Sequence, residues 1–392
     1  MFKGLSLDQA PPFEAPLLFF IIATIFAATG AMSMLFDNSF GTLHLITLGF
    51  MAMVMMGALQ QMLPVVVGVN FQKPWRFSLA TAIPIAIGII SFYLGFCCGI
   101  NSFLVAAIFL GVGLTIFIAA TIFKLIKVPH SSATVWGMRL ALISFLIALF
   151  LGLHFLSAFA LQKGFSNHLA LMHALFALGW VALLIIGVSY QVIPMFYVTK
   201  EPKNSLKLFF VFVPFFMMLA TAALIATKFA LLSFMALLIV CAIYAIMMLK
   251  LLWQRKRAIK EASIYFWYLG LMTLILLPFV WWIDRERATL LFLFGFGIST
   301  IFGMLYKIIP FLSWFHISSR GFFDMPTMKE MVNEKMAQLH FWLHAITLIS
   351  LFIDLRLTGL LFGVSVLLLA INLYNPIKIY LSYKKRPSPF GS

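Results

Sequence analysis

Long apolar segments separated by short polar breaks dominate the pattern of the chain. A transmembrane helix needs about 20 consecutive apolar residues, and the breaks are rich in Asn, Asp, Gly and Pro, which favour turns. The pattern predicts twelve transmembrane helices, at 15–37, 43–66, 77–99, 102–125, 138–160, 167–195, 206–226, 229–252, 263–283, 288–312, 336–354 and 358–380.

The segment from Ser313 to Lys335 is the longest connector between these helices. Within it, Thr327 and Glu330 have the spacing of a capping box, in which two side chains satisfy backbone N–H groups at the start of a helix. This spacing predicts that the eleventh helix begins early, outside the membrane.

Composition supports a membrane protein. Of the 392 residues, 64% are hydrophobic and 10% are charged, whereas soluble domains have about 45–50% apolar and about 25% charged residues. No connector is long enough for a soluble domain, and the polar first fifteen residues precede a full-length apolar run. The first apolar segment is therefore predicted to be a retained helix and not a cleaved signal peptide. We predict an all-α integral membrane protein.

The formal net charge of +16 raises the question of nucleic-acid binding. The basic residues argue against it, because they gather at helix ends. All but five of the 27 Lys and Arg lie at the termini or at the ends of even-numbered helices. Positive charge is enriched in cytoplasmic loops, so both termini are predicted to be cytoplasmic and the principal partner is the lipid bilayer.

One pattern, Gly-x7-Gly-x3-(Gln or Lys)-x2-Pro, occurs in the second, sixth and tenth predicted helices. Glycines allow membrane helices to approach closely, a long polar side chain can reach the membrane interface, and proline helps to end a helix. The three copies consist of Gly49, Gly57, Gln61 and Pro64; of Gly179, Gly187, Gln191 and Pro194; and of Gly295, Gly303, Lys307 and Pro310.

The spacing of the copies predicts an internal symmetry. The first glycines are 130 and then 116 residues apart, which is four helices each time. We therefore predict a single transmembrane domain, residues 1–392, built from three pseudo-threefold four-helix units at about 1–127, 128–257 and 258–392.

Two histidines occupy similar positions in this repeat. His44 precedes Gly49 by five residues and His173 precedes Gly179 by six, so both are predicted at nearly equal depth in the external half of the membrane. Imidazole is a common ligand of haem iron, and the two could bind one haem from both sides. The alternative is a hydrogen bond to a backbone carbonyl or to a hydroxyl such as that of Thr42.

The haem would be of b type, because the chain has no C-x-x-C-H motif for covalent attachment. The glycines near both histidines are expected to leave room for a flat macrocycle. His154 and His168 are alternative ligands, and His154 could form a copper site with His168 or with His173. His168 and His173 are five residues apart, about 140° round a helix, so they can serve one ion only if the helix begins between them.

His340 and His344 lie one turn apart on the eleventh helix, a spacing that suits two ligands of one ion. They are candidates for a second metal or haem site, and hydrogen bonding between helices is the alternative. His130 and His316 fall in predicted connectors and are expected to be solvated. All eleven Asp and Glu lie in loops or at helix ends, which weakens proton-pump and transporter hypotheses.

The twelve helices in three groups of four resemble the catalytic subunit of haem–copper oxidases. His44, followed by Leu48-Gly49-Phe50 and by the segment from Gly57 to Pro64, is also similar to the NnrS family, twelve-helix membrane proteins that bind haem and copper and are associated with nitric oxide metabolism. The likeness in architecture covers the whole chain, and the likeness in sequence covers helices 2, 6 and 10.

The resemblance implies a bacterial-type inner membrane protein with haem b, possible copper, and a redox partner protein or quinone. It implies that His44 is a haem ligand, whereas helix 6 of the oxidases carries a copper ligand. The chain departs from the oxidases because its helices 7 and 10 contain no histidine. A dioxygen-reducing centre of the usual composition therefore cannot be assembled.

Two hypotheses about function follow. In the first, the protein binds haem, with copper as a further possibility, and acts in electron transfer or in nitric oxide or oxygen metabolism. In the second, it is a transporter or channel for a small solute or metal ion. A visible absorption spectrum separates the two, since only the first expects haem.

Overall fold

The computed structural model describes residues 12–36, 40–99, 101–128, 131–256, 259–387 and 389. Every regular element in these ranges is a helix, and three of the segments, marked η, are π-helical. The elements are α1 (Glu14–Ser33), α2 (Phe40–His44), η2 (Leu45–Ala52), α3 (Met53–Met62), η3 (Leu63–Val67), α4 (Pro74–Cys97), α5 (Phe103–Ile126), α6 (Ala133–Ala160), α7 (Asn167–Tyr197), α8 (Asn204–Ala223), α9 (Phe229–Trp253), α10 (Ala262–Ile283), α11 (Arg285–Leu290), η4 (Leu291–Ile298), α12 (Ser299–Ser318), α13 (Glu334–Ser350) and α14 (Leu355–Lys384).

Each predicted transmembrane segment corresponds to a helix or to a continuous series of helices. The second segment is α2 to η3, and the tenth is α11 to α12. Eleven helices of the described chain are long and apolar enough to cross a membrane. The remaining predicted segment is α13, which has 17 residues and spans about 25 Å at 1.5 Å per residue.

The distribution of side chains is that of a protein in lipid. Large apolar side chains are exposed on the outside of the helices, for example Ile25, Phe150 and Trp282, which are 59%, 65% and 73% exposed. Small polar side chains such as Ser144 and Ser189 are fully buried. So large an exposed apolar surface is unfavourable in water, and the chain is therefore a multi-pass membrane protein.

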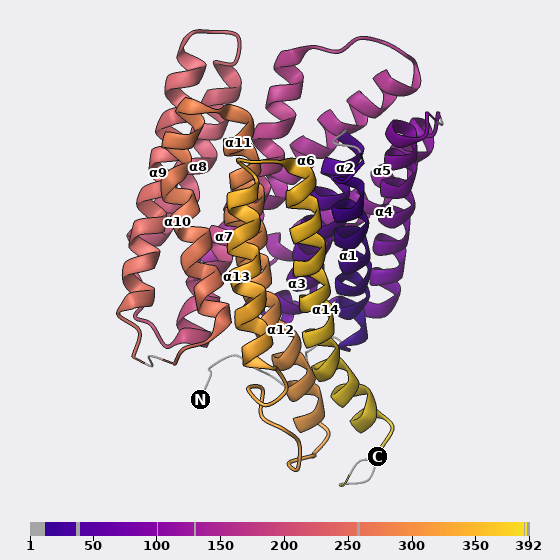
Figure 1. The fold of residues 1–392 in the computed structure, drawn as a ribbon, viewed down its shortest axis with the longest axis vertical. Coiled ribbons are helices and arrows are strands. Elements are labelled where there is room, and N and C mark those ends of the chain that lie inside the picture. The colour runs from indigo at the N-terminus through magenta and orange to yellow at the C-terminus, as the bar shows by residue number, and fades with distance from the viewer. Residues whose placement is uncertain are drawn as a thin grey trace. The chain divides into compact units, whose positions relative to one another are not determined.

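The described chain forms two compact units. Unit 1 lies within residues 1–78, 259–270 and 293–392, so it combines the first and last helices of the chain. Within it α14 packs against α1, α12 and α13 (Figure 1). The Tyr380 hydroxyl of α14 donates to the Glu14 carboxylate of α1 at 2.7 Å, and Lys384 forms an ion pair with the same carboxylate.

Unit 2 lies within residues 79–258 and 271–292. Its helices pack mainly against their neighbours in sequence: α5 on α6, α6 on α7, and α8 on α9 (Figure 1). The closest of these contacts joins α6 and α7, where Gly137 and Gly187 face each other. A Cβ atom added to Gly187 would lie 2.7 Å from the Cα of Gly137.

The second glycine of the repeated pattern makes the same local contact in all three copies. In each copy, a Cβ atom at this position would meet a backbone carbonyl in the first turn of the preceding helix. The distances are 3.1 Å from Gly57 to Pro16 O of α1, 3.5 Å from Gly187 to Thr134 O of α6, and 2.8 Å from Gly303 to Ser263 O of α10. Close helix approach, which was the predicted role of these glycines, is confirmed at this position.

Two copies of the pattern also share an irregular backbone. The π-helical segment η2 runs from four residues before Gly49 to three residues after it. The segment η4 has the same register around Gly295. The matching part of α7 is α-helical throughout. Helices 2 and 10 are therefore alike in conformation as well as in sequence, while the predicted threefold arrangement of four-helix units stays a prediction.

The predicted early start of the eleventh helix is wrong. The Glu330 carboxylate does accept from the Thr327 N–H at 2.8 Å, but the Thr327 hydroxyl also donates to this carboxylate at 2.9 Å. That hydroxyl is therefore not used to cap a backbone N–H, and only a turn follows. These two bonds hold the pKa of Glu330 below its usual value. The helix begins at Glu334, where the Asn333 side chain accepts from the N–H of Met336.

The polar position of the repeat differs between its copies. Lys307 forms an ion pair with Glu261, and Gln191 is exposed. Gln61 is 4% exposed, and neither of its amide atoms has a hydrogen-bond partner among the described residues. The prediction that this side chain reaches the membrane interface is wrong for Gln61, because its position on α3 directs the side chain into the interior of unit 1.

Candidate functional site

His44 is the last residue of α2 and directly precedes the π-helical segment η2. Its Nδ1 lies 2.7 Å from the backbone carbonyl oxygen of Phe40. A carbonyl only accepts hydrogen bonds, so Nδ1 carries the ring proton and Nε2 has the lone pair that can bind a metal. Of the two alternatives to a ligand role, the bond to a backbone carbonyl is therefore present, and the Thr42 hydroxyl bonds to that of Ser33 at 2.6 Å.

The backbone directly after His44 is π-helical. A π-helix widens the backbone by one residue per turn, and such turns in proteins are found frequently at functional sites. The same widening around Gly295 follows Leu290, the residue that matches His44 in the repeat. The backbone geometry is therefore shared by both copies, and the histidine is found in one of them.

His173 lies on α7 in unit 2 and has the same hydrogen-bond pattern. Its Nδ1 lies 2.9 Å from the backbone carbonyl oxygen of Ala148 on α6. Gly152 makes this approach possible, because a Cβ atom there would lie 3.2 Å from Cε1 of the imidazole. The ring also packs edge-on against Phe155, with 5.6 Å between the ring centres. As in His44, the proton is on Nδ1 and Nε2 is the nitrogen suited to a metal.

The alternative ligands His154 and His168 are both exposed. The side chain of Ser166 caps α7 by accepting from the backbone N–H of His168, so the helix begins before both His168 and His173. These two histidines therefore point in different directions and cannot serve one ion. Among the described residues, no three His, Cys, Asp or Glu side chains are placed to hold a metal ion together.

His340 and His344 are fully buried on α13 in unit 1. The Nδ1 of His340 lies 3.0 Å from the Tyr306 hydroxyl of α12. The Nε2 of His344 lies 2.9 Å from the hydroxyl of Ser299 and 3.2 Å from the carbonyl oxygen of Phe294. Hydrogen bonding between helices, one of the two predicted roles, is therefore present at both histidines.

The prediction that His316 is solvated is wrong. It lies on α12, which extends to Ser318, and its ring stacks on that of Phe13 with 6.1 Å between the ring centres. The connector predicted from Ser313 is thus partly helical. His130 lies outside the described residues.

The room expected beside the first glycines for a macrocycle is absent. A Cβ atom at Gly49 would lie 2.8 Å from the Phe26 side chain, so α1 already fills this space. At Gly179 the Met218 side chain occupies it. A haem ligated by His44 or His173 must therefore lie against another part of the helix surface.

Unit 2 contains an apolar cavity of about 70 Å³ next to Gly179. Its walls come from several helices of this unit and are almost entirely hydrocarbon, with Met218, Leu238, Cys241 and Trp281 among the lining residues. A small apolar pocket of this kind can hold small uncharged molecules. The volume is too small for a haem and suits a diatomic gas.

Sequence reasoning missed Tyr306 and Ser299, the partners of the buried histidines. A weak signal for Tyr306 exists, since it immediately precedes Lys307 in the third copy of the repeat.

Comparison with known protein families found no match, and comparison with curated proteins found none either.

Proposed function

We propose that the protein is a haem-binding membrane protein that acts in electron transfer or in nitric oxide or oxygen metabolism. His44 is proposed as an axial ligand and His173 as the second. The observation that carries the proposal is the hydrogen bond from Nδ1 to a backbone carbonyl at both histidines. Histidines that bind metals commonly donate their other ring N–H in this way, which fixes the tautomer and the ring orientation.

The two histidines have defined tasks in this proposal. Each would present Nε2 to the iron, and each is held in place by a carbonyl, Phe40 O for His44 and Ala148 O for His173. A bound haem supplies one-electron chemistry at its iron. The apolar cavity in unit 2 supports the part of the proposal that concerns nitric oxide or oxygen, because its lining suits an uncharged diatomic molecule.

The experiment uses His44→Ala and His173→Ala, with His316→Gln as a control histidine outside the proposed ligand set. Haem is quantified as the pyridine haemochrome, and reduced-minus-oxidised spectra are recorded for each purified protein. We expect both alanine variants to lose haem or to change their spectra, and the control to match the wild type. Unchanged haem content and spectra in both alanine variants would refute the assignment.

The two variants also show which of the two histidines binds the haem. If only His44→Ala loses haem, the second axial ligand is another residue, and His168, His154 and His344 are tested next. Copper is quantified in the same samples, because His154 could bind it together with His168 or with His173. A wild-type protein without haem would favour the alternative function, a transporter or channel for a small solute or metal ion.

A further inference from the structure

The two faces of α13 differ in a way that points to a function inside unit 1. The outer face carries large apolar residues that are more than half exposed, Leu339, Trp342, Ile346 and Ile349. The inner face carries His340, His344 and Thr347, each with no exposed surface. Ionisable side chains in the interior of a membrane protein are costly and usually functional.

Hydrogen bonds define the proton positions at the first histidine. Asn372 of α14 is oriented by Asn333: its Oδ1 accepts from the Asn333 N–H at 2.9 Å and its Nδ2 donates to the Asn333 carbonyl at 3.0 Å. The Tyr306 hydroxyl of α12 lies 3.0 Å from Nδ1 of His340. When the phenol donates to Nδ1, the ring proton of His340 is on Nε2.

The second histidine has the complementary arrangement. The carbonyl oxygen of Phe294 can only accept, so Nε2 of His344 carries its ring proton, and Nδ1 of His344 is the acceptor. The Ser299 hydroxyl lies 2.9 Å from this Nε2 and itself donates to Phe294 O at 3.3 Å. Ser299 is the first residue after the π-helical segment η4.

One donor and one acceptor remain between the two rings. Nε2 of His340 and Nδ1 of His344 are both buried and have no hydrogen-bond partner among the described residues. Both rings pack against the ring of Phe302, at 4.6 and 5.0 Å between centres, and against that of Phe266, at 5.0 and 5.8 Å. A single water molecule that accepted from His340 and donated to His344 would satisfy both atoms, as buried waters commonly do.

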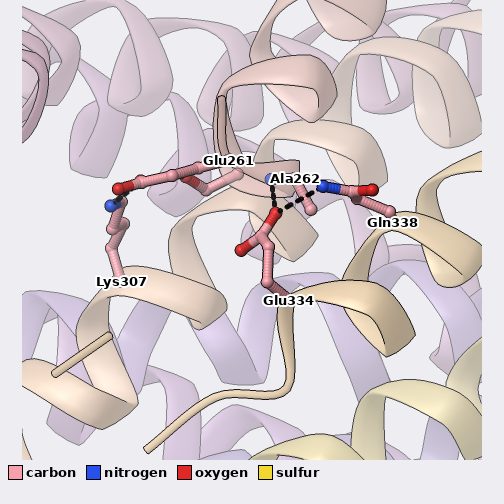
Figure 2. A network of polar contacts seen from close by, with 6 residues as sticks. Glu261, Ala262, Lys307, Glu334 and Gln338 are labelled. Atoms are coloured by element: carbon pink, nitrogen blue, oxygen red, sulfur yellow. Dashed lines mark hydrogen bonds and ion pairs between the residues drawn. The ribbon is translucent and has the colours of Figure 1, made fainter. Parts of the chain in front are cut away.

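Polar groups continue towards both ends of α13. At its start, the half-buried Glu334 carboxylate accepts from the backbone N–H of Ala262 at 2.6 Å and from Gln338 at 3.4 Å, with the Glu261–Lys307 ion pair on the neighbouring elements (Figure 2). At its other end, the buried Ser350 and Thr358 hydroxyls bond to each other at 3.0 Å. Thr358 also donates to the carbonyl oxygen of Asp354, the residue that caps α14.

We propose that these groups form a proton pathway through unit 1, from the Glu334 end of α13 to its Ser350 end. In the central part, the Tyr306 hydroxyl gives its proton to Nδ1 of His340 and is reprotonated from the Glu334 end, while Nε2 of His340 releases a proton to the bridging water. The water passes one of its own protons to Nδ1 of His344. Nε2 of His344 then releases a proton to Ser299, which passes its own hydroxyl proton on towards the Ser350 end. Every hydrogen bond in this part points the same way, and each imidazole gains one proton and loses one, so neither ring has to stay charged.

The pathway does not depend on haem binding. It also bears on the earlier argument that the positions of Asp and Glu weaken a role in proton movement. The absence of Asp and Glu from the middle of the apolar segments does not prevent proton movement, because neutral imidazoles act as proton shuttles.

The test measures proton flux in vesicles. The full-length protein is reconstituted into liposomes that contain a pH-sensitive dye, and a potassium gradient with valinomycin supplies the membrane potential. We expect a potential-driven flux for the wild type that falls to the level of protein-free vesicles in Tyr306→Phe and His344→Gln. The matched control is Trp342→Phe on the lipid-facing side of α13, which is expected to keep the wild-type flux.

The outcomes are distinct. Tyr306→Phe removes a single oxygen atom, so it answers the question if His344→Gln does not elute as a monodisperse protein. A wild-type flux no higher than that of empty vesicles overturns the proposal, and so does a wild-type flux in Tyr306→Phe. A metal ion in the purified protein that is lost in both His340→Gln and His344→Gln overturns it too, and makes the pair metal ligands. The haem spectrum of the same samples reports separately on the proposed function.

Discussion

Gly187 of α7 meets Gly137 of α6 so closely that an added methyl group has no place between the two helices. In Gly187→Ala, the new Cβ would lie 2.7 Å from the Cα and 3.2 Å from the carbonyl carbon of Gly137. In the reverse direction, a Cβ at Gly137 would lie 2.5 Å from the Cα of Gly187. The opposing atoms are backbone atoms, which cannot rotate away as a side chain can. The α6–α7 pair must therefore separate.

The cost follows from this contact. Overpacking in a well-packed interior costs about 1–3 kcal/mol, against which the better helix propensity of alanine offsets about 1 kcal/mol. We expect Gly187→Ala to be less stable than the wild type by up to about 2 kcal/mol. The loss is largest if the separation of α6 from α7 also disturbs the neighbouring helices.

The assay is reversible unfolding in mixed micelles of mild detergent and SDS, followed by intrinsic fluorescence. The matched control is Gly111→Ala on α5, where the new Cβ would lie 3.5 Å from the Leu153 side chain, an ordinary van der Waals distance. The control should be as stable as the wild type or slightly more stable. If Gly187→Ala were as stable as Gly111→Ala, the close approach of α6 and α7 would be wrong.

Two further predictions concern other parts of the chain. Cys97 and Cys98 are exposed at the end of α4 and Cys241 is buried, so a membrane-impermeant maleimide added to right-side-out cells should label the Cys97–Cys98 pair and not Cys241. Labelling of this pair only in inverted vesicles would reverse the predicted orientation. The cavity next to Gly179 should bind xenon under pressure in crystals, and Ala182→Leu, a substitution in its lining, should remove that binding; equal xenon occupancy in the variant would contradict the position of the cavity.

The helices were predictable because their signal is local. Apolar segments of transmembrane length and the polar breaks between them give the position of each helix to within a few residues. The start of α13 was missed because two capping signals compete, and Asn333 caps the helix whereas Thr327 only closes a turn. The hydropathy pattern does not indicate the π-helical segments. Each segment does lie at the same position relative to the first glycine of its repeat copy, Gly49 or Gly295.

The candidate site was predictable only as a set of residue types. Hydropathy and spacing single out His44, His173, His340 and His344, but their partners come from helix packing. Ala148 O lies 25 residues before His173 in the chain, and Ser299 lies 45 residues before His344. Pairings over such separations depend on how helices are arranged, which periodicity along one helix does not specify.

The central claim is that the chain holds haem through His44 and His173. The most direct measurement is the haem-to-protein ratio of the purified wild-type protein, from its pyridine haemochrome and Soret absorption, after expression with sufficient haem supply. The account predicts stoichiometric b-type haem that falls when either histidine is replaced by alanine. A wild-type protein that is folded, monodisperse and free of haem would contradict it.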